Sequence, residues 1–309
     1  MSLFSKPEVV ILKESSDAKN YLNQLEELKK QIPETSRHYK EIDKEIMMTK
    51  AGIAGEDAIM FELKNSGLDL VVLHDILLED PAGNKAQIDF YVITPCLNII
   101  IECKNLYGNI EINEKGDFVR TVSYSGKFYK EGIYSPITQN ERHIQVIKEC
   151  KWAESNFIYK LSLKRYFADY HKSLVVLANP KTVVNDKKAP QNVKDVVIRA
   201  DQLISKIKEL NAASGSGAFK LSAKEMREAG EIMLARNVEE RKDYIEKFAK
   251  WKNDIESDTV VETATESPES RICPRCGNPL VLRTAKKGDN IGNTFWGCSA
   301  FPKCRYHEY

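Results

Sequence analysis

Two neighbouring runs near the middle of the chain have the apolar patterns of β-strands. In the run 87–94, residues 87–92 alternate between polar or tyrosine side chains and apolar ones, and residues 97–101 are mostly apolar, as in a buried strand. The alternation predicts one strand face with Gln87, Asp89 and Tyr91 and the other with Ile88, Phe90 and Val92. The short connection Pro95–Asn98 predicts that the two strands form a hairpin.

Charged residues end the second of these strands. Successive side chains of a strand point to opposite faces, so Glu102 and Lys104 share one face. The hairpin brings Asp89 toward them. Two carboxylates held together repel each other unless a cation lies between them, and Mg²⁺ takes carboxylate oxygens, water and phosphate. The pattern therefore indicates phosphodiester cleavage that depends on Mg²⁺ or Mn²⁺, with the lysine serving the attacking water and the charge on the phosphate. A solvated strand face with a weak ion pair is the alternative.

Three motifs, in this order and spacing, resemble the nuclease-related domain: Gly52–Glu56, Gln87–Asp89, and Ile101–Asn105 followed by Gly108. The resemblance covers about residues 45–160. That family is regarded as a relative of the PD-(D/E)xK nucleases, which implies an α/β fold with a restriction-endonuclease-like core, a mixed sheet flanked by helices. It also implies that Asp89 and Glu102 hold the metal. The resemblance implies further that Glu56 supports metal binding from a helix and that Lys104 serves the water.

The stretch Ser135–His143 is similar to a Pro-x-x-Gln-x-x-x-His stretch of the same family, which adds Gln139 and His143 to the candidates. Ser135 suits an N-cap and Pro136 suits a first helical turn, so the two candidates would lie one turn apart on one helix face. An ordinary helix start is the alternative, and His143 alone suits a structural role equally well. Glu56 has a similar alternative, a polar stretch within a helix.

Four cysteines lie within the last 37 residues: Cys273, Cys276, Cys298 and Cys304. Two pairs separated by a loop predict a Cys₄ zinc ribbon, because structural Zn²⁺ takes four thiolates. Two disulfides are the weaker alternative, since the other cysteines are scattered in apolar contexts and nothing marks secretion. Together with Phe295–Cys298 and Phe301–Cys304, the pattern resembles the C-terminal zinc ribbons of bacterial type IA topoisomerases over about residues 271–309. The resemblance implies binding of single-stranded DNA.

Cations and aromatic rings are interspersed in this ribbon, the mixture that single strands require. The predicted nucleic-acid-binding residues are Arg275, Arg283, Lys286, Lys287, Trp296, Lys303, Arg305 and Tyr306. Phe295 and Phe301 are expected to fill the small core of the ribbon instead.

Charge divides the chain more sharply than its net value of +1 suggests. Residues 254–270 carry six acids and no Lys or Arg, whereas residues 271–309 carry seven Lys and Arg against two acids. We therefore predict an acidic, flexible linker before a basic ribbon. The predicted divisions are a helical segment (1–44), the nuclease-like domain (45–215), a second helical segment (216–253), the linker (254–270) and the ribbon (271–309).

The remaining patterns complete an α/β domain. Residues 173–178 and 195–199 are typical of further strands, and residues 222–237 and 239–255 of amphipathic helices. Residues 16–32 and 34–50 predict helices that pack on the core, with a homodimer contact as the alternative. No apolar run is long enough to span a bilayer and no hydrophobic signal segment begins the chain, which predicts a cytoplasmic protein.

The sequence as a whole favours a metal-dependent deoxyribonuclease with a DNA-binding tail. Two other classes stay open. One is a nucleic-acid-binding module that no longer cuts. The other is a regulatory factor that acts by protein contacts.

Overall fold

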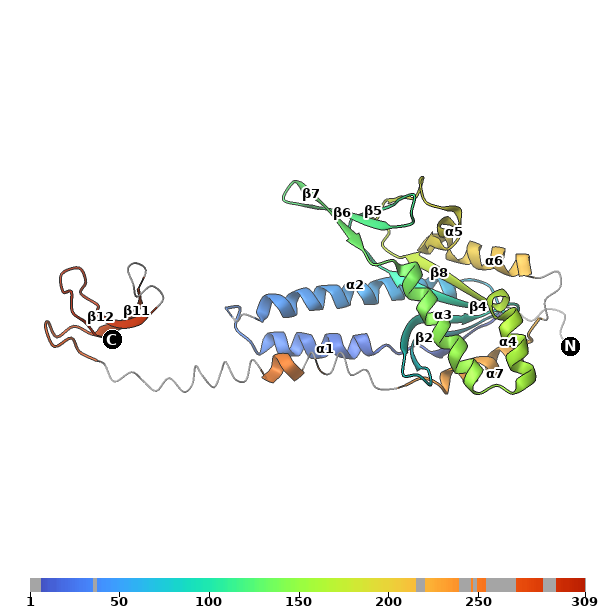
Figure 1. Cartoon of the computed structure of the whole chain (residues 1–309), viewed down its shortest axis with the longest axis horizontal. Coiled ribbons are helices and arrows are strands. Elements are labelled where there is room, and N and C mark those ends of the chain that lie inside the picture. The colour runs from blue at the N-terminus through green and yellow to red at the C-terminus, as the bar shows by residue number, and fades with distance from the viewer. Residues whose placement is uncertain are drawn as a thin grey trace. The chain divides into compact units, whose positions relative to one another are not determined.

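The computed structural model describes residues 7–35, 38–214, 220–238, 246, 249–253, 271–285 and 293–308 (Figure 1). The chain divides into two compact units, Met1–Phe248 and Ala249–Tyr309, and each is described by itself. The predicted linker 254–270 lies outside the described residues, as do Lys286 and Lys287. Of the helix predicted over residues 239–255, the described residues 246 and 249–253 are helical.

A six-stranded mixed sheet forms the centre of the first unit, in the order β1-β2-β3-β4-β8-β10. Strands β2, β3 and β4 are antiparallel, which confirms the predicted hairpin, whereas β1–β2, β4–β8 and β8–β10 pair in parallel. The strands are β1 (Val9–Lys13), β2 (Leu70–Glu79), β3 (Lys85–Ile93), β4 (Asn98–Lys104), β8 (His171–Leu177) and β10 (Val197–Arg199).

Helices cover both faces of this sheet, as predicted for an α/β fold. Apolar side chains of α2 (Tyr39–Lys64) and α6 (Leu203–Ser214) pack on one face, and those of α3 (Pro136–Ala153), α4 (Phe157–Tyr170) and α7 (Ala223–Leu234) pack on the other. The helix α1 (Asp17–Lys30) buries Tyr21, Leu25 and Leu28. Helix α2 is continuous through residues 44 and 45, where the sequence analysis places a boundary. Two short helices complete the unit, α5 (Gln191–Lys194) and the 3₁₀ helix η1 (Ala200–Gln202).

A second, smaller sheet has the order β7-β6-β5-β9. Its strands are β5 (Asn109–Ile112), β6 (Phe118–Tyr124), β7 (Lys127–Ile133) and β9 (Val184–Asn185). Strands β6 and β7 form a hairpin that projects from the body of the unit (Figure 1). Its two-residue turn, Ser125 and Gly126, has φ of 49° and 75°. Positive φ at both central residues is the requirement of the type I′ turn, which matches the twist of the flanking strands.

The predicted alternation of β3 is wrong at its centre. Ile88 packs with Tyr91 on the α3 side of the sheet, whereas Phe90 packs on the α2 side. Opposite this point, Asp75 of β2 has a φ of 58°, and the ladder pairs His74 with Phe90 and Ile76 with Ile88 without pairing the residues between them. At this irregular position, the side chains of both strands change the sheet face to which they point. The periodicity of one strand alone does not predict such a change.

The second unit contains a three-stranded antiparallel sheet: β11 (Leu280–Thr284), β12 (Thr294–Cys298) and β13 (His307–Glu308). Its buried core is small and consists of Leu280 with the cysteines Cys273, Cys298 and Cys304. Within the described parts of both units, no helix combines the length and apolar character needed to cross a membrane.

Helix α2 approaches β4 closely at Gly55, and this contact generates a first prediction. A Cβ at Gly55 would lie 2.7 Å from Asn105 Cβ and 3.0 Å from Cys103 Sγ. Gly55→Ala should therefore destabilise the unit by about 1–3 kcal/mol, the usual range for overpacking. Gly52→Ala is the matched control, because nothing lies within 4 Å of a Cβ there and alanine favours a helix. Urea unfolding checks both, and equal stability of the two variants would contradict the prediction.

Candidate functional site

The site begins where β3 and β4 separate. Their ladder ends at the pair Phe90 and Ile101, so the backbone N–H of Cys103 has no backbone partner on β3. The carboxylate of Asp89 takes that place, and its Oδ2 accepts a hydrogen bond from Cys103 N at 2.7 Å. The divergence of two strands thus places a half-buried carboxylate beside the end of β4.

Glu102 and Lys104 lie on one face of β4, as predicted, and meet the first turn of α3. Lys104 Nζ donates to Glu102 Oε1 at 2.6 Å and to Gln139 Oε1 at 3.0 Å. Ser135 caps α3 and Pro136 begins it, as expected from the sequence. Glu102 is only 2% exposed, so its charge depends on this lysine rather than on solvent.

His143 lies one turn after Gln139 and faces the same carboxylate. Its Nδ1 is 3.5 Å from Glu102 Oε2. Both atoms are buried, and neither has a hydrogen-bond partner among the described residues. Burial, and then the positive charge of Lys104, lower the pKa of His143 to about 4, so the ring is neutral at pH 7. A buried carboxylate oxygen without a donor is therefore present at the centre of the site.

Both carboxyl groups have raised pKa values, and the charge of Glu102 contributes to the shift at Asp89. Burial, followed by the negative charge of Glu102, raises the pKa of Asp89 well above its ordinary value, and the Cys103 N–H opposes this shift. Burial also raises the pKa of Glu102, and Lys104 opposes that shift. Protonation or a cation would relieve the same strain, because either removes the uncompensated negative charge.

Two asparagines fix the helices that surround these groups. Asn105 Nδ2 donates to the carbonyl of Ala51 at 2.6 Å and so ties α2 to the end of β4. The fully buried Asn140 Nδ2 donates to Ile100 O, to Leu174 O and to Ser173 Oγ. Because Asn140 follows Gln139 directly, these bonds to β4 and β8 set the position of Gln139.

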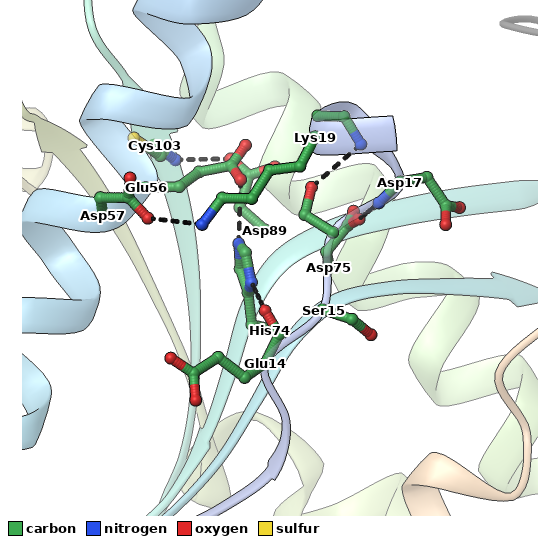
Figure 2. Close-up of polar contacts among 12 residues, drawn as sticks. Glu14, Ser15, Asp17, Lys19, Glu56, Asp57, His74, Asp75, Asp89 and Cys103 are labelled. Atoms are coloured by element: carbon green, nitrogen blue, oxygen red, sulfur yellow. Dashed lines mark hydrogen bonds and ion pairs between the residues drawn. The ribbon is translucent and has the colours of Figure 1, made fainter. Parts of the chain in front are cut away.

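Glu56 projects from α2 and is held by a histidine of β2 (Figure 2). His74 Nε2 lies 2.9 Å from Glu56 Oε2, and His74 Nδ1 lies 3.0 Å from the carbonyl oxygen of Glu14. A carbonyl only accepts, so Nδ1 carries a hydrogen and donates it. His74 is 5% exposed and also stacks on Phe90, so Glu56 has a rigid partner.

The segment that joins β1 to α1 completes this arrangement (Figure 2). Glu14 supplies the carbonyl that orients His74, and the backbone N–H of Asp17 donates to Asp75 Oδ2 at 3.2 Å. Lys13 Nζ donates to the carbonyls of His74 and Asp75. The irregular position in β2 is therefore stabilised by residues near the start of the chain.

A cavity of about 240 Å³ joins the predicted site residues. It is lined by Gly52, Glu56, Gln87, Asp89, Glu102, Cys103, Lys104, Asn105, Gln139 and His143. The structure thus brings all five predicted catalytic residues together. Among the described residues, the acids of this cavity do not form a cluster of three ligand oxygens like the cysteine cluster of the second unit. Two carboxylates with water and phosphate are nevertheless a sufficient ligand set for Mg²⁺, and the unpartnered Glu102 oxygen fits that use.

The four cysteines of the second unit form a metal centre. Their sulfur atoms all lie within 4.8 Å of one another, with Cys273 and Cys304 Sγ 3.8 Å apart and Cys276 and Cys298 Sγ 3.3 Å apart. A tetrahedral Zn²⁺ with bonds of about 2.3 Å separates its sulfur ligands by about 3.8 Å. The cluster fits a structural Zn²⁺.

The solvent exposure of the ribbon's aromatic rings differs from the expectation. Phe301 is 57% exposed, with the Arg283 guanidinium 5.7 Å from its ring, so the expectation that it fills the core is wrong. Trp296 and Tyr306 are half-buried against the cysteines. The other described cations predicted to bind nucleic acid lie on the surface: Arg275, Lys303 and Arg305.

Two family models match the chain, one over the candidate site and one over the cysteine centre. Residues 51–178 match the family model of the nuclease-related domain. The first unit contains a nuclease-related domain. Residues 270–309 match the model of the topoisomerase DNA binding C4 zinc finger, so the second unit carries a topoisomerase-type zinc ribbon. The α2, β3, β4 and α3 site residues all lie within the nuclease-related domain.

Curated relatives are similar over a small part of the chain. DNA topoisomerase 1 of Mycoplasma genitalium is 32% identical over 80 residues, 25% of this chain and 11% of that protein. DNA topoisomerase 1 of Methanocaldococcus jannaschii is 52% identical over 40 residues, 13% of this chain and 5% of that protein. An uncharacterized protein of Haemophilus influenzae is 45% identical over 40 residues, 13% of this chain and 20% of that protein. No solved structure matches the chain.

Sequence reasoning missed two residues that position the site, His74 and Asn140. A signal for His74 was present, because His74 and Asp75 interrupt an otherwise apolar run, Leu70–Leu78, and buried polar residues need partners. Asn140 gave no signal of its own, since its three acceptors lie on strands 33 to 40 residues away.

The cysteine geometry generates the second prediction. Cys298→Ser should reduce the zinc content of the purified chain from one per chain to nearly none, because three thiolates hold Zn²⁺ far less tightly than four. Elemental analysis after dialysis measures the metal. Cys150→Ser is the control, because that cysteine is buried in the first unit, and it should retain the zinc. Full zinc content in Cys298→Ser would contradict a Cys₄ site.

Proposed function

We propose that this protein is a metal-dependent nuclease that hydrolyses DNA phosphodiester bonds and holds DNA with its zinc ribbon. One observation supports the catalytic part above all. Asp89 and Glu102 lie together with raised pKa values beside Lys104, and a Glu102 oxygen in this group is buried without a donor. Active sites are where such strained combinations are retained, because a structural site would replace them by apolar residues.

Each residue has a role that follows from its position. Asp89 and Glu102 would hold Mg²⁺ or Mn²⁺, and the bound cation would polarise the phosphate and the attacking water. The Lys104 ammonium, fixed between Glu102 and Gln139, donates to the attacking water and to the phosphate oxygen as negative charge develops there. Glu56, braced by His74, supports the ligands from α2. The neutral His143 ring offers a lone pair or an N–H without adding charge.

Removal of the lysine or of one carboxylate tests this proposal. Lys104→Ala and Asp89→Ala should each lower the rate of cleavage of labelled DNA at least 100-fold with Mg²⁺ or Mn²⁺, since each removes a charge acting on the transition state. Lys85→Ala, an exposed lysine at the far end of β3, is the control and should cleave normally. Quenched-flow or gel assays on single-stranded and duplex DNA, with an EDTA blank, give the rates.

Two results would overturn the catalytic proposal. Full cleavage by Lys104→Ala would remove this site from the reaction. Binding of every DNA substrate without cleavage by the wild-type chain would favour the non-catalytic binding module.

The zinc ribbon is proposed to bind single-stranded DNA. Its hollow is lined by rings and cations together, among them Arg283, Phe295, Phe301, Arg305 and Tyr306. Unpaired bases stack on exposed rings, and phosphates pair with the guanidinium groups. Phe301 is the ring that the structure leaves most open for stacking among the described residues of the ribbon.

The ribbon's role predicts two separable effects on binding. Phe301→Ala should weaken single-strand binding about tenfold, and Arg305→Ala should lower the slope of log affinity against log salt by about 1, because one phosphate contact is lost. Leu282→Ala is the control, because this exposed side chain lies on β11 next to Arg283 and points to the other face of the strand. Fluorescence anisotropy at several salt concentrations measures both quantities. Binding that is independent of salt would instead favour the regulatory protein-contact alternative.

A further inference from the structure

The β6–β7 hairpin exposes an unusual amount of aromatic surface. Tyr124 is 74% exposed, Phe128 is 77% exposed and Tyr129 is 50% exposed. Scattered apolar side chains on a surface need no explanation, but adjacent large rings on one projecting element mark a contact surface. The rings of the hairpin therefore form a candidate contact surface.

The strand register determines which of these rings share a face of the hairpin. Tyr124 pairs with Lys127 and Val122 pairs with Tyr129, so Tyr124, Lys127 and Tyr129 share one face of the hairpin. The two tyrosines are diagonal neighbours there, at the separation where rings line up along a ribbon. Phe128 lies on the other face at the tip.

The base of the hairpin is fixed to the body of the unit. Phe118 is 1% exposed and packs with Ile110, Ile112 and Ile133. Next along the hairpin, Arg120 Nε donates to Glu131 Oε1 at 2.6 Å across the two strands. The rings beyond this pair are held on a stem rather than on a loop, so binding to them costs little ordering entropy.

The chain segment that forms β5, β6 and β7 is joined at both of its ends to elements of the candidate site. Strand β4 ends at Lys104 and β5 begins at Asn109. Strand β7 leads through Tyr134 into α3, which carries Gln139, and the hairpin projects beside the start of α3 (Figure 1). The Arg142 guanidinium lies 5.5 Å from the ring of Tyr134, which is 58% exposed. A cation and exposed rings thus continue from the site toward the hairpin.

Charge identifies the kind of partner. Residues 118–134 carry three cations, Arg120, Lys127 and Lys130, against one acid, Glu131. Arg120 pairs with Glu131, and Lys130 Nζ lies 3.5 Å from Glu111 Oε2 of β5, so Lys127 beside the turn is the hairpin cation without such an ion pair among the described residues. An exposed cation, Lys127, beside exposed rings fits a polyanion that presents flat faces. Bases within a duplex stack on each other, so only unpaired nucleotides offer those faces.

We propose that the β6–β7 hairpin binds unpaired nucleotides of the nucleic acid whose phosphate enters the candidate site. The inference rests on the proposed nuclease function. It extends that function by assigning a single-stranded segment next to the cleaved bond, stacked on Tyr124 and Tyr129.

Crosslinking and binding by the full chain test this inference without requiring cleavage. A labelled oligothymidylate that carries 5-iodouracil is bound in Ca²⁺, irradiated and mapped by peptide mass spectrometry, and its affinity is measured by anisotropy. Crosslinks are expected at Tyr124 or Tyr129. The variant Tyr124→Ser/Phe128→Ser/Tyr129→Ser should bind at least about fivefold more weakly, and Tyr124→Phe/Tyr129→Phe should bind like the wild type because its rings remain.

A matched control removes three exposed rings from α4. Phe157, Tyr159 and Tyr166 are 82%, 51% and 40% exposed, and their triple serine variant should bind normally. Wild-type affinity of the hairpin triple variant, with crosslinks confined to residues 271–309, would overturn the inference. So would a change of oligomeric state in that variant, since the rings would then be a protein contact. Hairpin crosslinks without cleavage in Mg²⁺ or Mn²⁺ would instead refute the nuclease function and leave the hairpin as a binding element.

Discussion

This site depends on one constraint: two carboxyl groups, those of Asp89 and Glu102, lie together where little solvent reaches them. Burial raises the pKa of Asp89 and of Glu102, and the charge of Glu102 adds to the shift at Asp89. The surrounding structure offers only partial compensation: a backbone N–H for Asp89 and the ammonium of Lys104 for Glu102. Such a pair costs stability, and in the proposed reaction a cation or the developing transition state would supply the missing compensation.

The physical unit that supports the site is larger than the matched nuclease-related domain. Residues 51–178 contain the site residues, but the carbonyl that orients His74 belongs to Glu14. Helix α2, which carries Glu56, begins at Tyr39 and packs against α1. Strand β1 extends the sheet in parallel with β2. The N-terminal elements therefore take part in positioning Glu56, in addition to covering apolar surface.

The strands, the helix start at Ser135 and the cysteine centre were predictable because each depends on local pattern or on ligand chemistry. Alternating apolar residues predict which strand positions are buried, and Ser-Pro predicts a capped helix start. The spacing of the cysteines predicts a zinc site. What failed depends on contacts between distant segments. The reversal at Asp89 requires the irregular partner strand at Asp75, and the exposure of Phe301 depends on how the ribbon strands close around the sulfur atoms. No periodicity in a single segment carries that information.

The charge pattern explains why two nucleic-acid-binding parts in one chain would cooperate. Residues 254–270 carry six acids, which repel phosphate, so a strand bound by the basic ribbon, and by the hairpin as proposed, would avoid contact with this segment. In the proposed function, a strand captured by the ribbon would be present at a raised effective concentration near the site, which would increase occupancy without any new contact. Neither contact needs to be tight, and weak contacts let a product strand leave. The chemistry can therefore depend on a few buried charges while the affinity depends on exposed rings elsewhere.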